Sequence, residues 1–260
     1  MHNFEFVKPA TIADAVAAMA NGGQALSGGQ TLLPTMKQRL AEPGVLVSLT
    51  GIPEMKGVCQ GDGGLHVGAA TPHAVVAAQA ASIYPALARL AGGIGDPAVR
   101  NRGTIGGSIA NNDPAACYPA GVLASGATVV TNMRSIAADD YFQGMFSTAL
   151  DDGEIIVEVR FPIPERAAYV KFDQPASRFS LTAVFVAKYA DGVRVAVTGA
   201  SNDGVFRWTE AETALSASFS AAAIAGLVVD PSGMIGDMHG TPEYRANLVK
   251  VLTARAVTAA

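Results

Sequence analysis

The spacing of hydrophobic positions predicts a small α/β unit in residues 1–51. Short apolar runs, typical of buried strands, alternate with amphipathic stretches that are typical of helices. Thr11, with Asp14 three residues later, resembles a capping box at the start of the first helix. The expected elements are strands at 4–7, 25–26 and 45–49, and helices at 15–20 and 32–40. Their β-α-β-α-β order favours strands packed on helices.

A second α/β unit is expected in residues 52–164. It opens with a hairpin whose turn is Gly61-Asp62-Gly63-Gly64, and Asp113 and Pro114 suit the cap and first position of a helix. Pro162 and Pro164 follow its last strand, which places a domain boundary there. The expected elements are a hairpin at 57–70, a long Ala-rich helix at 72–91, an irregular Gly-rich stretch at 92–113, a helix at 114–124, and strands at 127–131 and 154–161.

The remaining residues, 165–260, change from strand-like alternation to helical periodicity. Asp191-Gly192 is typical of a tight turn between two of the strands. The expected elements are strands at 169–172, 181–189 and 193–200, followed by helices at 209–215, 219–228 and 242–258. A sheet followed by helices indicates an α+β domain, and the chain contains no internal repeat.

Composition and charge narrow the classes of function. The chain has 18 Lys and Arg against 22 Asp and Glu, a net charge of −4, and no basic cluster, which disfavours nucleic-acid binding. The N-terminus lacks the features of a signal peptide, and the longest apolar stretch, near 217–229, is too short to span a membrane. The chain is therefore expected to be cytoplasmic. Its 15% charged residues suit a protein with partners and an ordinary Ala-rich protein equally.

Cysteine and histidine spacing predicts no metal site in this chain. Cys59 and Cys117 are far apart and form no CxxC pair, so the chain is not expected to hold an iron–sulfur cluster by itself. The four histidines show no metal-ligand spacing and are expected to be surface residues or satisfied core residues. They are His2, His66, His73 and His239.

Two glycine-rich segments are the candidate ligand-binding loops. The first is Ser27-Gly28-Gly29-Gln30-Thr31-Leu32, and the second is Gly103-Thr104-Ile105-Gly106-Gly107-Ser108-Ile109-Ala110. Paired glycines expose backbone N–H groups and admit a bulky anion without Cβ clashes. Neither segment matches GxGxxG or GxxxxGK[ST], so the residues alone indicate either a phosphate site or two turns. Arg100 and Arg102, just before the second loop, suit ligand phosphates and surface ion pairs equally.

The order of several motifs resembles the FAD-binding medium subunits of molybdenum hydroxylases, the family of carbon monoxide dehydrogenase and xanthine dehydrogenase flavoprotein subunits. The resemblance runs along nearly the whole chain, which makes it more specific than either loop alone. The matching segments are Phe4 to Pro9, Gly28 to Pro34, Gly95 to Asn101, Thr104 to Ser108, Asn112 to Ala115, Tyr169 to Phe172, Ala176 to Phe179 and His239 to Arg245.

This resemblance implies an α+β fold: a two-subdomain FAD-binding fold of the vanillyl-alcohol-oxidase/p-cresol-methylhydroxylase type, followed by a C-terminal α+β domain. It implies FAD between the first two subdomains, with Lys171 on the flavin ring side. Many relatives have an acidic residue at the position of Cys117, so one FAD hydrogen bond is in question there. The residues implied to contact FAD are Leu26, Ser27, Gly28, Gly29, Gln30, Thr31, Leu32, Gly95, Thr104, Ile105, Gly106, Gly107, Ser108, Cys117, Ile155, Ile156 and Lys171.

The resemblance also implies a function, an electron relay without catalytic residues of its own. Electrons would arrive from [2Fe-2S] clusters of a small partner subunit, after hydroxylation at the molybdopterin cofactor of a large partner, and leave to an external acceptor. The implied assembly is a dimer of heterotrimers. Two alternatives remain open: a stand-alone FAD-dependent oxidoreductase, and a non-catalytic scaffold subunit that has lost its cofactor.

Overall fold

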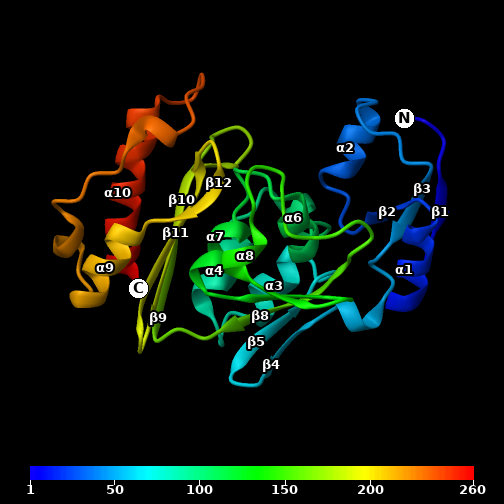
Figure 1. Cartoon of the computed structure of the whole chain (residues 1–260), viewed down its shortest axis with the longest axis horizontal. Helices are drawn as coiled ribbons and strands as arrows, with labels where there is room; N and C mark the ends of the chain where they lie inside the picture. Colours follow the sequence, from blue (N-terminus) through cyan, green and yellow to red (C-terminus); the bar gives the residue numbers. More distant parts are fainter.

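A small parallel sheet forms the N-terminal part of the protein, and the computed structural model describes all 260 residues (Figure 1). Strand order is β1-β3-β2, and α1 packs on β2 and β3. The N-cap at Thr11 is confirmed, since Thr11 Oγ1 accepts a hydrogen bond from Asp14 N at 3.1 Å. The second bond of a capping box is absent, because the Asp14 carboxylate accepts from the Thr11 hydroxyl instead of the backbone N. The elements are β1 (Glu5–Val7), α1 (Ile12–Ala20), β2 (Gly23–Leu26), α2 (Leu32–Lys37) and β3 (Val45–Ser48), in the predicted order.

A five-stranded antiparallel sheet forms the second part, with strand order β4-β5-β8-β6-β7. Its hairpin turns at the predicted residues, 61–64. The strands are β4 (Val58–Gly61), β5 (Gly64–Gly68), β6 (Thr128–Thr131), β7 (Ser135–Ala137) and β8 (Ile156–Pro162). β7 was not predicted, because three residues are too few to show an alternating pattern.

Short helices, rather than one long helix and an irregular stretch, connect the strands of this second sheet. The predicted helix at 72–91 is wrong, because Pro85 disfavours helical geometry at Tyr84 and separates two helices. The Gly-rich stretch after it is helical in two places, which begin at the side-chain caps of Asp96 and Thr104. The helices are η1 (Pro53–Met55), α3 (His73–Gln79), α4 (Pro85–Gly92), α5 (Pro97–Arg100), α6 (Ile105–Asn111), α7 (Tyr118–Ala124) and α8 (Ala138–Tyr141).

The helix expected at 114–124 begins later than predicted. Asp113 accepts a hydrogen bond from Ala115 N at 2.8 Å, so it caps a turn, and α7 starts only at Tyr118. Pro114 lies in that turn, and its carbonyl accepts hydrogen bonds from Thr198 Oγ1 and Gly199 N of the third sheet. The turn is therefore a contact between the second and third parts of the chain.

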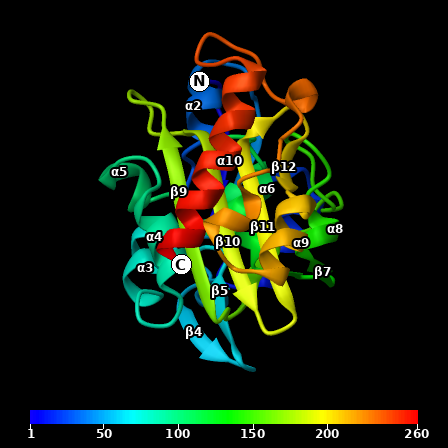
Figure 2. The same ribbon diagram turned by 90° about the vertical axis from the view of Figure 1, so that its left-hand side faces the viewer.

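A four-stranded antiparallel sheet with order β12-β11-β10-β9 forms the third part. The predicted turn at Asp191-Gly192 joins β10 to β11. Helices α9 and α10 cover one face of this sheet, and α4 and α7 of the second part pack on it too (Figures 1 and 2). The elements are β9 (Arg166–Asp173), β10 (Ser180–Tyr189), β11 (Gly192–Ser201), β12 (Gly204–Arg207), α9 (Thr209–Ala217), η2 (Ala221–Ile224), η3 (Pro231–Gly233) and α10 (Pro242–Ala259). The helix predicted at 219–228 is only the short η2.

Two hydrophobic clusters hold these layers together. The larger one contains Ala15, Tyr84 and Phe185 and therefore draws on all three sheets or their helices. The smaller one lies between the third sheet and its own helices, α9 and α10. The three sheets fall within the ranges expected for three domains, but the shared core makes them one packed body. No helix has both the length and the apolar character needed to cross a lipid bilayer.

A buried arginine anchors α10 to the third sheet. Arg245 donates hydrogen bonds from Nη1 to the carbonyl oxygens of Leu181 and Gly199, at 2.6 and 2.7 Å. Nη2 bonds the Asp237 carboxylate at 2.7 Å. Because only 3% of Arg245 is exposed, water cannot replace these bonds. They hold the first turn of α10 on the third sheet.

We expect Arg245→Ala to lower the free energy of unfolding by about 2–4 kcal/mol, because it removes three hydrogen bonds of a buried charged group, two of them to backbone carbonyls. Urea unfolding of the full chain measures this loss. Arg255→Ala, at an exposed position of the same helix, is the matched control and should cost less than about 0.5 kcal/mol. Equal losses in the two variants would contradict the anchoring role.

Candidate functional site

All three parts of the chain line one cavity with a volume of about 600 Å³. This size lies within the range of roughly 300–1,000 Å³ that is typical of small-molecule and cofactor sites. All but two of the site residues expected from the sequence line it. Those that do are Leu26, Ser27, Gly28, Gly29, Gln30, Thr31, Leu32, Gly95, Thr104, Gly106, Gly107, Ser108, Cys117, Ile155 and Ile156.

The first glycine loop joins β2 to α2. Gly29 has φ +69°, a left-handed conformation that favours glycine, and its carbonyl accepts a hydrogen bond from Leu33 N at 3.2 Å. Gln30 Nε2 folds back to the carbonyl of Gly28 at 3.1 Å. The loop therefore turns sharply at the edge of the parallel sheet and presents its residues to the cavity.

The second glycine loop begins α6. Thr104 caps this helix through its Oγ1, which accepts a hydrogen bond from Gly107 N at 3.2 Å. A Cβ on Gly106 would lie 2.6 Å from the Cβ of Ala69, so glycine is needed here for close packing against the end of β5. This loop thus sits on the second sheet, and the first loop belongs to the N-terminal sheet.

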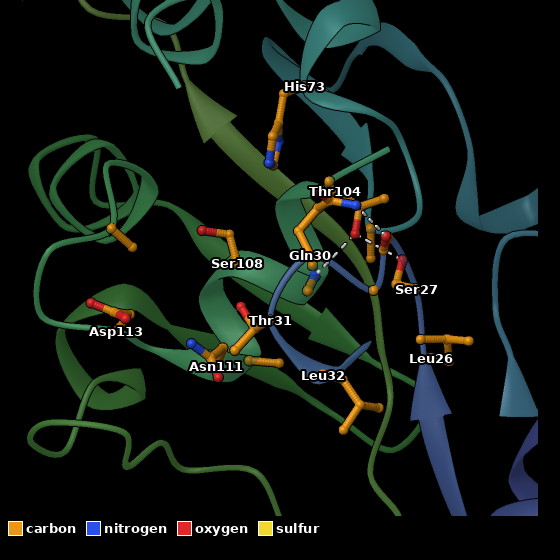
Figure 3. Close-up of a pocket in the computed structure, with 18 of the residues that line it drawn as sticks. Leu26, Ser27, Gln30, Thr31, Leu32, His73, Thr104, Ser108, Asn111 and Asp113 are labelled. Atoms are coloured by element: carbon orange, nitrogen blue, oxygen red, sulfur yellow. Dashed lines mark hydrogen bonds between the residues drawn. The ribbon is translucent and has the colours of Figure 1, made fainter. Parts of the chain in front are cut away.

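The two loops touch each other directly. Ser27 Oγ and Thr104 Oγ1 are hydrogen-bonded at 2.7 Å, as the dashed lines in Figure 3 show. A Cβ on Gly28 would lie only 2.2 Å from the carbonyl oxygen of Arg102. Because no side chain fits in that space, Gly28 allows the loops to approach until their backbones are in contact. This contact fixes the spacing of the two halves of the cavity wall.

A third wall of the cavity is held by a buried carboxylate. Glu154, which lines the cavity, accepts hydrogen bonds from Thr131 Oγ1 at 2.6 Å and from Arg134 Nε at 3.1 Å. The hydrogen bonds from Arg134, opposed by burial, lower the pKa of Glu154 to about 2. The next residue, Ile155, is held by a 2.7 Å bond from its N to Asn132 Oδ1. Glu154 therefore fixes the strand that brings Ile155 and Ile156 to the cavity.

Two predicted site residues do not line the cavity. Ile105 points into the larger hydrophobic core and is fully buried there. Lys171 Nζ donates to the carbonyls of Gly93 and Arg178, at 2.7 and 2.9 Å, and forms an ion pair with Asp173 at 2.7 Å. Their expected contacts with FAD therefore remain predictions.

Cys117, the departure from the family pattern, does line the cavity. Its Sγ is 3.6 Å from Ser180 Oγ and 3.9 Å from Lys171 Nζ. The thiol is 6% exposed, in agreement with a small buried residue. The Lys171 ammonium therefore lies behind the thiol of Cys117, which lines the cavity. Its ion-pair partner is the Asp173 carboxylate.

The sequence did not identify several residues that also line the cavity. Asn111, Asp113 and Ile94 flank the second loop, and Ser177, Arg178 and Phe179 come from the β9–β10 connection. Their motifs were recognised, but spacing does not tell which side chain faces a ligand. Arg100, expected to pair with a phosphate or an acidic group, instead donates from Nη1 to the carbonyls of Ile94 and Gly95. It therefore shapes the loop that contains Gly95.

His73 is the lining residue that differs most from expectation. It is 4% exposed, and its Nδ1 has no hydrogen-bond partner, so it is neither a surface residue nor a satisfied core residue. Burial, followed by the positive charge of Arg100, lowers the pKa of His73 to about 4. At neutral pH this imidazole is uncharged.

Comparison with known proteins identifies the class of this fold and site. Residues 2–164, more than half of the chain, match the family of the FAD binding domain in molybdopterin dehydrogenase. The chain therefore belongs to this family, its cofactor is FAD, and it is a subunit of an oxidoreductase. The resemblance inferred from the sequence motifs is confirmed.

Individual relatives match over nearly their full length. The chain is 34% identical to the nicotine 6-hydroxylase medium subunit of Paenarthrobacter nicotinovorans and 32% identical to the carbon monoxide dehydrogenase medium chain of Afipia carboxidovorans. Each match covers 98% of this chain and 96% of the relative. A chain of reconstituted CO dehydrogenase from Oligotropha carboxidovorans superposes with a TM-score of 0.91 at 29% identity, covering 99% of this chain and 97% of that one. The expected α+β fold with an FAD-binding part is confirmed.

We expect Gly28→Ala to weaken FAD binding at least about tenfold, because the added Cβ forces the two loops apart. Titration of the flavin-free full chain, followed by flavin fluorescence, measures the dissociation constant. Gly226→Ala is the matched control, since a Cβ at Gly226 meets nothing within 4 Å. A Gly28→Ala variant that binds FAD as tightly as this control would contradict the role of the loop contact.

Glu154→Gln should destabilise the chain in a pH-dependent way. Because the folded-state pKa of Glu154 is lowered from its ordinary value of 4.5 to about 2, its contribution is present above pH 4.5 and is lost as the pH falls towards 2. We expect the variant to lose on the order of 1–3 kcal/mol of unfolding free energy at pH 7, and less at pH 3. Urea unfolding of both proteins at the two pH values measures this. A difference that does not change with pH would show that Glu154 contributes only through packing.

Proposed function

We propose that this chain is the electron-transfer subunit of a heteromeric molybdenum hydroxylase. It receives electrons from the [2Fe-2S] clusters of a small partner subunit and passes them to an external acceptor. The observation that carries this proposal is the cavity built from two glycine loops of different sheets, in a chain that aligns end to end with medium subunits. Hydroxylation itself takes place at the molybdopterin cofactor of a large partner.

The two loops suit the diphosphate of FAD. Gly28 follows Ser27 in the chain, Gly107 N donates to Thr104 Oγ1, and both glycines line the cavity. Gly107 has no side chain to cover the backbone at the start of α6, where an anion can approach. The space that a Cβ on Gly28 would fill is already occupied by the backbone of the other loop, so the loops form one binding surface.

The rest of the cavity suits an isoalloxazine ring, and bound FAD supplies the two-electron redox chemistry. Ile155 and Ile156 give an apolar wall that excludes water. Lys171 places a positive charge 3.9 Å from the cavity-lining Sγ of Cys117, close enough to stabilise negative charge in the cavity without lining it. Cys117 offers a thiol at a position where the resemblance implies a carboxylate in many relatives.

The proposed partners follow from the full-length relatives, which are medium chains of multi-subunit enzymes. We expect an iron–sulfur small subunit, a molybdopterin-binding large subunit, and a dimer of such heterotrimers. The chain has no group of three or more His, Cys, Asp or Glu side chains placed to hold a metal ion. The metal centres of the complex are accordingly expected in the other two subunits.

Purification of the tagged full chain from its native host tests the assembly. We expect it to bring down two further polypeptides, with molybdenum, iron and one FAD per chain. A yellow chain that is isolated alone, without molybdenum or iron, would instead support a stand-alone flavoenzyme. A colourless chain that does not take up added FAD would support a scaffold subunit.

The relay itself is tested on the isolated complex after reduction with dithionite. Re-oxidation by oxygen, NAD⁺ or a quinone should be rapid for at least one acceptor, and should lose most of its rate once the flavin is removed. Re-addition of FAD should restore it. A flavin-free complex that is re-oxidised as fast as the complete one would contradict the proposed relay through this chain.

A further inference from the structure

Only four buried side-chain polar atoms in the protein have no hydrogen-bond partner. They are His73 Nδ1, Tyr118 Oη, Tyr169 Oη and Arg245 Nε. The other two nitrogens of Arg245 are hydrogen-bonded, and neither tyrosine lines the cavity. His73 is the one of the four that does line it. An unsatisfied buried polar atom destabilises the folded state, so native structures normally supply a partner for it.

Three contacts hold His73 in place, one of its backbone and two of its ring. The backbone N of His73, at the start of α3, donates to the carbonyl of Gly103 at 2.9 Å. Its ring lies against the second glycine loop, where a Cβ on Gly103 would be 2.6 Å from Nε2. The ring of Tyr118 contacts it from another side, with centroids 5.3 Å apart. These contacts hold the imidazole beside the loop, so the only turn open to it is a half-turn within the same space.

The ring is directed into the cavity. Figure 3 shows the imidazole extending from α3 towards the space between Thr104 and Ser108. Burial keeps it uncharged, so it offers one N–H donor and one nitrogen acceptor. A half-turn of the ring exchanges its nitrogen and carbon positions, so a nitrogen can be presented to a ligand in either orientation.

We infer that His73 is a cofactor-binding residue whose imidazole hydrogen-bonds the oxygen-rich middle of FAD, its diphosphate or ribityl chain. The inference rests on the proposed placement of FAD, with the diphosphate at the two glycine loops. Gly103 and Thr104, beside the ring of His73, belong to the second of these loops. An imidazole N–H in that position donates to a phosphate or hydroxyl oxygen. The imidazole, which makes no side-chain hydrogen bond within the protein, thus gains a partner when FAD binds.

His73→Leu is the decisive variant, because it removes the polar atom and keeps an apolar side chain of similar size. We expect FAD affinity to fall about tenfold, the loss of one hydrogen bond. The melting temperature of the flavin-free variant should not fall, because the unsatisfied nitrogen is gone. His73→Asn, which keeps a polar atom near the position of Nδ1, should retain most of the affinity.

Tyr118→Phe is the matched control. It also removes an unpartnered buried atom from the same ring pair, but from a side chain outside the cavity. We expect the flavin-free control to be as stable as wild type or more stable, with unchanged FAD affinity. Both quantities are measured on the full chain by FAD titration and by thermal unfolding without FAD.

Two results would overturn the inference. One is wild-type FAD affinity in His73→Leu or, if that variant does not fold, a loss of about tenfold in the affinity of His73→Asn. The other is an equal loss of affinity in His73→Leu and Tyr118→Phe, which would assign the effect to packing of the two rings. Failure of the wild-type chain itself to bind FAD would reject the proposed site instead, so the two failures are distinguishable.

Discussion

The close contact between the two glycine loops determines the geometry of the site. Gly28 lies against the backbone of Arg102 and Gly103, and Ser27 is hydrogen-bonded to Thr104. The loops belong to different sheets, so this contact also sets the position of the N-terminal sheet relative to the five-stranded one. A ligand between them meets two turns of backbone at a fixed spacing, which is the preorganisation that binding of a diphosphate requires.

The third sheet completes the cavity and stabilises its shape. Helices α4 and α7 pack on this sheet, and the carbonyl of Pro114 accepts a hydrogen bond from Thr198 of β11. Lys171 connects the end of α4, through Gly93, to the β9–β10 connection, through Arg178. This connection lines the cavity, so one lysine links the third sheet to the site without facing it. The larger hydrophobic cluster holds the three parts of the chain together, and all three line the cavity.

Much of this was predictable from the sequence, because its signals are local. A strand, a glycine pair and a helix follow one another within a few residues, so the β-α-β-α-β order and both loops could be identified. Helices α5 and α6 were missed, since seven residues or fewer, with Gly106 and Gly107 inside, show little periodicity. The predicted helix at 72–91 overlooked the effect of Pro85 on Tyr84.

The unexpected features of the site depend on contacts between distant segments. Ile105 and Ile109 are one helical turn apart and both face the core, so Ile105 cannot line the cavity beside Thr104. The unpartnered state of His73 depends on where α3 meets the second loop and α7, which no spacing in the sequence specifies. The same holds for Lys171, which donates to the carbonyl of Gly93 at the end of α4, far away in the sequence.

Hydrogen–deuterium exchange of the full chain, with and without FAD, tests most directly whether the two loops act as one binding surface. The account predicts that FAD protects the backbone amides of residues 27–32 and of residues 103–108 together. Protection of only one loop, or of neither in a chain that holds FAD, would contradict it.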